Sequence, residues 1–225
     1  MKRIGLSLCI RYEHELQDCL NHSYVHYLDR FGVVPVLIPN TLDEPQEYVD
    51  SLSLDGLLLT GGSDTIKSVD GVSTEHVSLR DRTERALTTW ACKRRIPVMG
   101  ICRGFHFLNV YFGGKIVFDI HTKGIIHETH VGRNHNIILV HEGIRQMLNT
   151  NSIIVNSYHN NGITFDSLAL PFVAFAEVDG LVEGAVHTKL PVCGIQWHPE
   201  RPCPSSEIND RLFENFLAGT LWRTQ

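Results

Sequence analysis

One cysteine of this sequence lies where a reactive side chain can be presented to a substrate. Cys102 stands between Gly100 and Gly104, directly after the apolar run Ile96–Met99. The pattern G-x-C-x-G has the form of a nucleophile elbow, in which a sharp turn between a strand and a helix exposes the central side chain. Glycines are needed on both sides because the turn brings the strand and the helix close together. The partial positive charge at the helix N-terminus favours the reactive thiolate, and a buried cysteine in a tight turn is the alternative.

A thiolate also needs a general base, and the base needs a group that orients it. The apolar run Val192–Trp197 leads into His198, Pro199 and Glu200. Residues two apart in an extended chain face the same way, so Glu200 can accept a hydrogen bond from His198 and aim its second ring nitrogen at the sulfur. On its own, the segment favours a solvated histidine at the end of a strand.

Together, GICRG after a strand and GIQWHPE much later in the chain resemble the class I glutamine amidotransferases, whose catalytic order is Cys, His, Glu. The resemblance implies Cys102 as the nucleophile, His198 as the base and Glu200 as the third member of the triad. It extends over most of the chain and implies a flavodoxin-like α/β fold. We expect one such domain over residues 1–225.

The segment Leu59–Asp64, LTGGSD, resembles the glycine loop of the same family. On that match, the backbone N–H groups of Gly62 and Arg103 form the oxyanion hole, and Gly61 lies against the substrate. Loss of one such donor typically raises a reaction barrier by roughly 3 kcal/mol.

Three features resemble the free-standing γ-glutamyl hydrolases of this superfamily, the peptidase C26 group that includes γ-glutamyl-γ-aminobutyrate hydrolases. Arg103 follows the nucleophile, where many ammonia-producing subunits have a smaller or apolar residue. Arg80 and Asp81 followed by Glu84 resemble the R-D-x-x-E of that group, although a capped, solvated helix start is the alternative. The segment Val155–Asn160, VNSYHN, resembles its V-N-S-x-H, with a polar turn after a strand as the alternative.

The same resemblance implies which residues hold the substrate. Ser157 and His159 would line the glutamyl pocket, and Tyr158 would stand in its wall. His106 occupies the position of a family glutamine that contacts the glutamyl group, and an imidazole can still donate or accept a hydrogen bond there. With Gly61, these residues are the predicted substrate-binding set.

Short apolar runs alternate with helical stretches in the first half and predict right-handed βαβ units around a central, mostly parallel sheet flanked by helices. The predicted strands are Ile4–Ile10, Val33–Ile38, Leu54–Leu59 and Ile96–Ile101, and the predicted helices are Asp18–Phe31, Pro45–Leu52, Leu79–Arg94 and Arg103–Phe112. The second half predicts a small antiparallel ribbon and the far side of a mixed sheet, with strands at Asn136–Val140, Ser152–Asn156, Val173–Glu177, Gly184–His187 and Val192–Trp197. A helix at Glu207–Leu221 closes the chain, and Ile66–Ser78 is a predicted surface loop.

The composition argues against several classes of protein. The chain has 225 residues, of which 43% are hydrophobic and 20% charged, and a net charge of −5. No basic cluster predicts a nucleic-acid or membrane partner, and no apolar stretch approaches the ~20 residues of a membrane span. The run Ile4–Ile10 lacks the cleavage site of a signal peptide, so we expect a cytoplasmic protein.

Two further sets of residues have side chains that can bind metals or form disulfides. Cys9, Cys92 and Cys193 lie in apolar runs and are expected to be buried, unreactive thiols. The segment His127–His130 reads H-E-x-H, which lacks the spacing that places two zinc ligands on one helix face. We therefore predict no metal and no cofactor. The histidines of this region are expected at the surface or at the mouth of the site: His121, His127, His130, His135 and His141.

These inferences predict a cysteine hydrolase that cleaves the γ-glutamyl amide bond of an N-substituted glutamine and releases glutamate through a thioester. The substrate is a small molecule, either a γ-glutamyl amine or a γ-glutamyl nucleotide phosphoramidate such as a γ-glutamyl-CDP-amidate, whose phosphate Arg103 or Arg201 could bind. Two alternatives stay open. One is a glutaminase subunit that supplies ammonia to a partner synthetase, and the other is a non-catalytic binding module on the same scaffold.

Overall fold

A nine-stranded mixed sheet crosses the part of the chain that this computed structural model describes, residues 1–12, 14–62, 75–126 and 131–222. Its strand order is β4-β1-β5-β6-β11-β10-β9-β7-β8. The first five strands run parallel: β4 (Val34–Ile38), β1 (Arg3–Ser7), β5 (Gly56–Leu59), β6 (Val98–Ile101) and β11 (Val192–Ile195). The others continue the sheet by antiparallel pairing: β10 (Leu181–His187), β9 (Phe172–Val178), β7 (Val131–Leu139) and β8 (Ser152–Tyr158). The predicted mixed, mostly parallel α/β sheet is confirmed.

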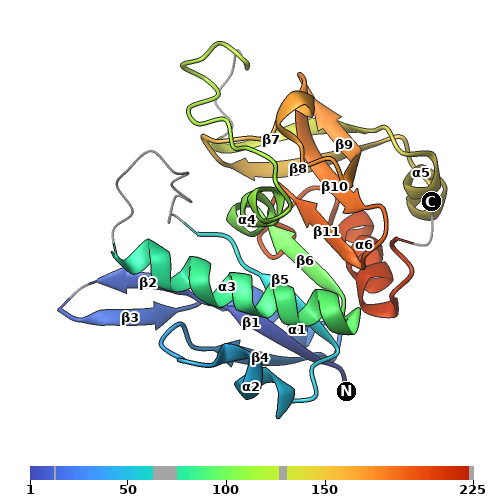
Figure 1. Ribbon diagram of the computed structural model, residues 1–225. Helices are drawn as coiled ribbons and strands as arrows, with labels where there is room; N and C mark the ends of the chain where they lie inside the picture. Colours follow the sequence, from blue (N-terminus) through green and yellow to red (C-terminus); the bar gives the residue numbers. More distant parts are fainter. Residues whose placement is uncertain (13, 63–74, 127–130, 223–225) are drawn as a thin grey trace.

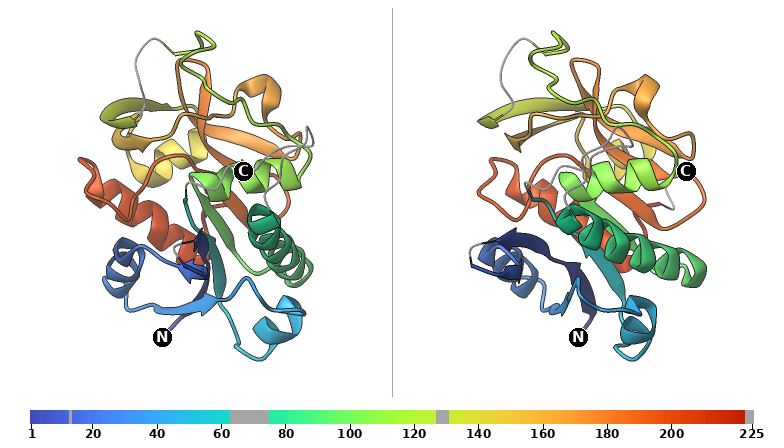
Figure 2. Two further views of the ribbon diagram at one scale, coloured as in Figure 1. Left: turned by 90° about the vertical axis from the view of Figure 1, so that its left-hand side faces the viewer. Right: turned by 60° about the vertical axis from the view of Figure 1, so that its left-hand side comes forward.

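Helices cover both faces of the parallel half of this sheet (Figures 1 and 2). The helices α1 (His22–Asp29) and α6 (Ser206–Ala218) lie on one face, and α3 (Glu75–Arg94) and α4 (Arg103–Tyr111) lie on the other. Two apolar clusters fill the layers between them. Leu57 and Leu58 of β5 belong to different clusters because successive strand side chains point to opposite faces. The remaining helical segments are α2 (Pro45–Asp50), α5 (Glu142–Leu148) and the 3₁₀ turn η1 (Phe165–Ser167).

The closing helix illustrates how local sequence sets an element's bounds. Leu212, Phe213 and Phe216 of α6 are buried against the sheet, as expected for an amphipathic helix. The helix ends at Ala218 because Gly219 adopts the left-handed conformation with φ 71°, which favours glycine. The predicted helix Glu207–Leu221 is therefore confirmed, with an earlier end.

The N-terminal region differs from the prediction. The expected strand Ile4–Ile10 is divided, and β2 (Cys9–Tyr12) pairs antiparallel with β3 (Leu16–Cys19) in a separate two-stranded ribbon. The expected helix Asp18–Phe31 therefore begins only at His22. Asp18 helps to hold the extended form, since its carboxylate accepts hydrogen bonds from the backbone and side chain of Asn40 at 2.8 and 2.6 Å.

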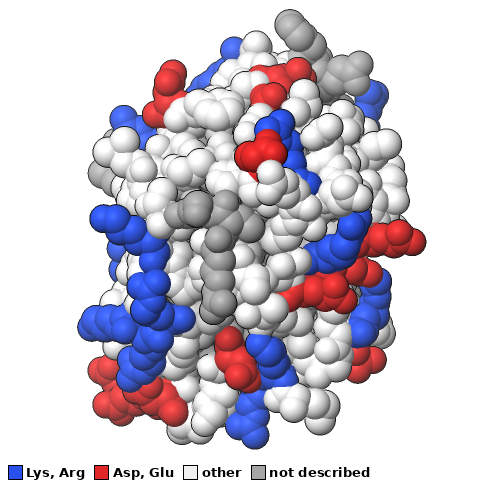
Figure 3. All heavy atoms as spheres, turned by 90° about the vertical axis from the view of Figure 1, so that its right-hand side faces the viewer, with Lys and Arg blue, Asp and Glu red and all other residues white. Residues whose placement is uncertain are grey.

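Two other expectations are corrected or lie outside the described residues. Of the predicted loop Ile66–Ser78, residues 66–74 are not among those described, and residues 75–78 belong to helix α3. The helix α5 was not predicted, because its short sequence EGIRQML has only two buried side chains, Ile144 and Leu148. On the face drawn in Figure 3, Lys and Arg side chains occur in several groups with Asp and Glu side chains beside them, as the modest net charge of −5 implies.

The parallel strands bring distant segments to one edge of the sheet. The residues that follow β1, β5, β6 and β11 all lie at the carboxyl ends of these strands. Ligands of open α/β sheets bind at this edge. It is where the glycine loop, Cys102 and the segment with His198 meet.

Candidate active site

Cys102 occupies a strained turn between β6 and α4. Its backbone has φ 53° and ψ −105°, a conformation that non-glycine residues rarely adopt. A Cβ atom on Gly100 would lie 2.5 Å from the carbonyl carbon of Gly104, and one on Gly104 would lie 2.1 Å from the carbonyl oxygen of Leu59. Both glycines are therefore required by close approach of the backbone. The predicted elbow geometry is confirmed.

His198 and Glu200 form a buried pair beside this elbow. The Nδ1 atom of His198 lies 2.7 Å from Oε1 of Glu200, and the residues are 2% and 7% exposed. Cys102 lines the same cavity as His198 and is among the groups that raise the pKa of His198. Burial lowers the pKa of His198, but the charges of Glu200 and Cys102 outweigh burial and raise the pKa to about 9. The alternative of a solvated histidine at a strand end is wrong.

The backbone of His198 is held by a side chain of β8, the edge strand of the sheet. Asn156 of β8 donates from Nδ2 to the carbonyl of His198 at 2.8 Å and accepts the N–H of His198 at 2.9 Å. The ring of Tyr158 meets the His198 imidazole edge-on, with centroids 5.6 Å apart. The segment NSYHN thus positions the histidine, a role for Asn156 that the sequence analysis did not predict.

The glycine loop lies against the same pair. A Cβ atom on Gly61 would lie 2.9 Å from Cε1 of His198, and one on Gly62 would lie 2.6 Å from Nη1 of Arg80. The N–H of Gly61 donates to the hydroxyl of Tyr24 at 2.8 Å. Gly61 is buried and Gly62 is exposed, so Gly62 is the loop glycine that borders the open space at Cys102.

A cavity of about 290 Å³ opens over Cys102. Cys102, His198 and Gly62 line it together with Arg11, Arg201 and other residues of the ribbon and its surroundings: Cys9, Ile10, Cys19, Asn21 and Tyr158. A larger hollow of about 530 Å³ lies at the amino ends of β6 and β11 and has no cysteine in its lining. The smaller cavity is therefore the candidate active site.

The outer part of the cavity is cationic. Arg11 and Tyr158 are exposed, and Arg201 is half-buried. The guanidinium carbon of Arg201 stands 4.4 Å from the centre of the Tyr158 ring, a cation–π contact that orients the arginine. These positions can attract a carboxylate or a phosphate.

The predicted substrate-binding residues do not all line this cavity. Tyr158 does, but Ser157, His159 and His106 are buried away from its lining. His106 shares a hydrogen bond of 2.7 Å with Gln196, and burial lowers the pKa of His106 to about 4. His106 is therefore a neutral donor or acceptor that joins α4 to the segment before His198.

His159 belongs to a second buried cluster. Its Nδ1 atom lies 2.8 Å from the carbonyl oxygen of Asn161, and its Nε2 atom lies 3.5 Å from Oε1 of Glu183. His135 approaches the same carboxylate at 3.6 Å. Burial lowers the pKa of His159. His159 therefore contacts Asn161 and Glu183, and its contact with a substrate stays a prediction.

The R-D-x-x-E segment is not a solvated helix start. Helix α3 begins earlier, at Glu75, and the side chains of Arg80 and Glu84 are fully buried. The guanidinium of Arg103 pairs with Asp81 and Glu84 and is 3% exposed. The expectation that the Arg103 side chain binds a phosphate is wrong, because its guanidinium faces these carboxylates. Arg201 does line the cavity.

The predicted burial of the other cysteines and the predicted exposure of the histidines agree with the structure only in part. Cys193 is buried as expected, whereas Cys92 is half-buried and Cys9 is half-buried and lines the cavity. His127 and His130 lie outside the described residues, and His121 is exposed. No group of three residues that could hold a metal occurs among the residues that the structure describes.

The cavity residues of the ribbon were missed by sequence reasoning. Arg11 and Asn21 lie in or beside segments that were predicted as a strand end and a helix. Neither CIRY nor LQDC alternates polar and apolar residues, so neither segment has the period-two pattern that predicts a strand.

Comparisons with known proteins agree with this geometry. The family model of peptidase C26 matches residues 4–200. The chain belongs to the peptidase C26 family. The family that the sequence motifs predicted is therefore confirmed.

Relatives of this C26 protein cover most of its length. A Schizosaccharomyces pombe protein assigned as a glutamine amidotransferase is 30% identical over 90% of this chain and 83% of its own. The γ-glutamyl-γ-aminobutyrate hydrolase PuuD of Escherichia coli K12 is 28% identical over 95% of this chain and 91% of its own. A solved structure from Thermoplasma acidophilum, assigned to GMP synthase, has a TM-score of 0.69 at 23% identity, over 98% of this chain and 94% of its own. That structure is similar in fold alone. Among the described residues, no helix has the length and apolar character needed to cross a bilayer.

Proposed function

We propose that this protein is a cysteine hydrolase that cleaves the γ-glutamyl amide bond of an N-substituted glutamine. Its family and its relatives support the coarser statement, a γ-glutamyl amide hydrolase or an amidotransferase-like enzyme. The observation that carries the proposal is the buried His198–Glu200 pair, 2.7 Å apart, beside Cys102 in a cavity. A non-catalytic binding module has no need of such a pair, because burying it costs desolvation.

The proposed reaction proceeds through a thioester. The Cys102 thiolate attacks the γ-carbonyl carbon, and the backbone N–H groups of Gly62 and Arg103 stabilise the oxyanion. His198 donates its proton to the departing nitrogen, so the C–N bond breaks and the amine leaves. His198 then takes a proton from water, whose oxygen attacks the thioester, and glutamate and free Cys102 are formed. The proposed sequence uses no cofactor.

The electrostatics support this assignment of roles. With a pKa of about 9, His198 is protonated at neutral pH and carries the proton that the leaving nitrogen needs. An imidazolium next to Cys102 also favours the thiolate. Glu200 stabilises the imidazolium and, with Asn156 on the backbone, fixes the ring orientation.

The cavity favours a substituted amide over free glutamine. Arg11, Arg201 and Tyr158 line it together with the reacting sulfur of Cys102. A leaving group larger than ammonia can contact them, and this binding energy can lower the barrier. A leaving group with a phosphate, as in a γ-glutamyl nucleotide amidate, gains charge-assisted hydrogen bonds from Arg11 or Arg201. A glutaminase subunit releases only ammonia and has no use for this surface.

Steady-state kinetics on glutamine, a γ-glutamyl amine and a γ-glutamyl nucleotide amidate test the proposal. We expect kcat/KM for at least one substituted amide to exceed that for glutamine by about tenfold or more. Arg201→Gln should lower kcat/KM for the nucleotide amidate more than for the amine. Arg211→Gln, an exposed arginine outside the cavity, is the matched control. If glutamine were the best of the three, or if activity required an added synthetase, the glutaminase-subunit alternative would replace the hydrolase.

A further inference from the structure

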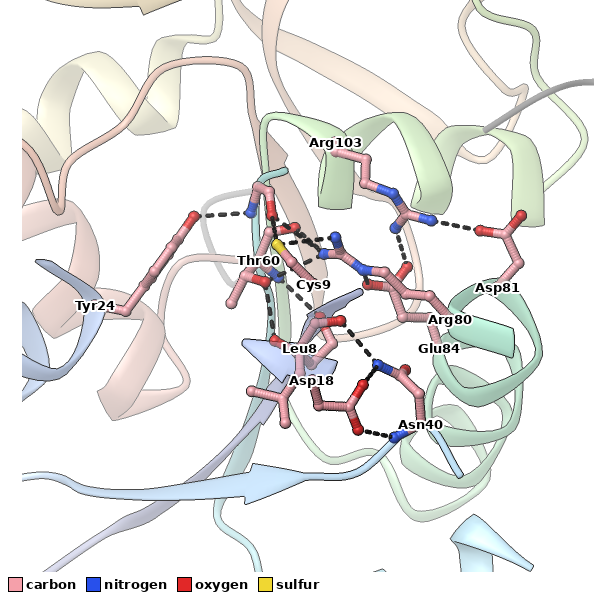
Figure 4. A network of polar contacts seen from close by, with 12 residues as sticks. Leu8, Cys9, Asp18, Tyr24, Asn40, Thr60, Arg80, Asp81, Glu84 and Arg103 are labelled. Atoms are coloured by element: carbon pink, nitrogen blue, oxygen red, sulfur yellow. Dashed lines mark hydrogen bonds and ion pairs between the residues drawn. The ribbon is translucent and has the colours of Figure 1, made fainter. Parts of the chain in front are cut away.

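One buried carboxylate joins the two backbone segments that are proposed to form the oxyanion hole (Figure 4). Glu84 of α3 is fully buried. Its Oε1 atom accepts a hydrogen bond from Nε of Arg80 at 2.9 Å, and its Oε2 atom accepts one from Nη1 of Arg103. A single residue thus bridges two guanidinium groups.

Arg80 carries this bridge to the glycine loop. Its Nη2 atom donates to the carbonyl oxygens of Thr60 at 2.6 Å and Gly61 at 3.3 Å. Ser7 lies beside the same loop: its hydroxyl oxygen accepts the N–H of Thr60 at 3.0 Å, and its side chain is among the groups that lower the pKa of Glu84. The carbonyl groups that precede Gly62 are therefore held through Glu84.

Arg103 carries the bridge to the elbow. It is the residue directly after Cys102, and its own N–H is the second proposed oxyanion donor. Its guanidinium is pinned between Glu84 and Asp81. The planar fork of an arginine can make such paired contacts, whereas the single ammonium group of a lysine cannot.

The charges explain why the central group has to be a carboxylate. Arg80 is 0% and Arg103 is 3% exposed at the side chain, so little water screens them from each other. Nearby arginines lower the pKa of Glu84 in spite of its burial, which keeps the carboxylate charged. A neutral residue between two buried guanidiniums would leave them to repel each other.

We propose that Glu84 is a positioning residue that sets the separation of the Gly62 and Arg103 N–H groups, by holding the glycine loop through Arg80 and the elbow through Arg103. This inference rests on the proposed function, because it needs an oxyanion to form. Donors of an oxyanion hole act at about 2.7–3.1 Å from the oxygen, so a small displacement of either segment weakens catalysis.

The variant Glu84→Gln tests the proposal with two probes of Cys102. Iodoacetamide alkylates the sulfur by displacement and forms no oxyanion. 4-Oxobutanoate adds its aldehyde carbon to the sulfur, and the carbonyl oxygen becomes an oxyanion that needs the hole. Cys102 that has reacted with 4-oxobutanoate cannot be alkylated by iodoacetamide. The loss of alkylation in the presence of 4-oxobutanoate, measured by mass spectrometry, therefore reports how well the aldehyde binds to the sulfur.

We expect Glu84→Gln to lower kcat roughly 100-fold, comparable to the loss of one oxyanion donor, with KM changed by less than about threefold. The concentration of 4-oxobutanoate that halves alkylation should rise by a similar factor, while the alkylation rate without aldehyde stays within about threefold of wild type. If both probes weakened equally, or if kcat and aldehyde protection were retained, the proposal would be overturned.

Two further variants separate an effect on the oxyanion hole from a general loss of stability. Arg80→Lys keeps one positive charge and should show the same split between the probes, to a smaller degree. Asp210→Asn removes an ion pair with Arg30 outside the network and should leave kcat within about twofold. If the wild type released no glutamate from any γ-glutamyl amide, the proposed function would fall. The comparison of aldehyde protection with alkylation would still decide the role of Glu84.

Discussion

Replacing Glu200 by glutamine removes the charge that faces His198, together with the ion pair that the same oxygen makes with Nε of Arg201 at 3.6 Å. Glutamine keeps a hydrogen-bond acceptor near Nδ1, now 2.7 Å from the carboxylate, but carries no negative charge. The imidazole ring should therefore keep its orientation, while the electrostatic stabilisation of its protonated form by the carboxylate is lost. Alanine at His198 is the reference, because it removes the base altogether.

The size of the effect follows from the burial of the pair. The pKa of His198 is about 9, against an ordinary 6.5, although burial acts to lower it. Glu200 is the strongest of the influences that raise it, so its loss should return the pKa to its ordinary range or below. A shift of two to three units corresponds to about 3–4 kcal/mol of support for the imidazolium. Movement of nearby side chains and entry of water beside His198 should restore part of this lost stabilisation. We therefore expect kcat to fall about 30- to 300-fold.

Two measurements check this prediction. The kcat of Glu200→Gln should lie between those of the wild type and His198→Ala. The rate of Cys102 alkylation at pH 7 should also fall, since an imidazole that is less often protonated stabilises the thiolate less. A variant more damaged than His198→Ala, or an unchanged alkylation rate, would refute the assignment of roles.

Three further predictions concern the elbow and the buried histidines. Cys102→Ala should fold normally and lose glutamate release by at least about a thousandfold; activity above about a hundredth of wild type would rule out a cysteine nucleophile. Gly104→Ala should lower stability by roughly 2–4 kcal/mol in urea unfolding, because its Cβ would meet the carbonyl oxygen of Leu59 at 2.1 Å, and a loss under about 0.5 kcal/mol would contradict the packing. The free energy of unfolding should peak near pH 6.5. Toward pH 9 it should fall, because the stabilisation from protonated His198 is lost as the pH rises from 6.5 through the folded pKa of about 9. Toward pH 4 it should also fall, because His106 is protonated in the unfolded chain and stays neutral in the folded protein. Urea unfolding at several pH values measures both limbs, and a curve that rises from pH 6.5 to pH 9 would contradict the first.

The sequence allowed the fold to be predicted where local pattern and tertiary structure agree. The parallel strands are short apolar runs bounded by glycine or proline, and β4, β5 and β6 lie within the predicted ranges. The ribbon of β2 and β3 was missed because its strands have four residues each, with polar side chains, and depend on pairing and on Asn40.

In the candidate site too, some residues could be predicted from local sequence pattern and others could not. Cys102 and its flanking glycines could be predicted because a tight turn leaves a local signature in the sequence. The inner network could not, because Glu84 meets Arg103 only after α3 and α4 pack on the same face of the sheet. His106 and Ser157 were assigned to the pocket by position in a motif; both side chains are buried, and neither lines the cavity over Cys102.

A competition between water and hydroxylamine shows whether hydrolysis passes through a γ-glutamyl thioester on Cys102. If it does, two substrates with different leaving groups form the same intermediate. The ratio of γ-glutamyl hydroxamate to glutamate should then be the same for a γ-glutamyl amine and a γ-glutamyl nucleotide amidate at one hydroxylamine concentration, and Cys102→Ala should form neither product. A ratio that depends on the leaving group, or glutamate release that persists in Cys102→Ala, would contradict the proposed mechanism.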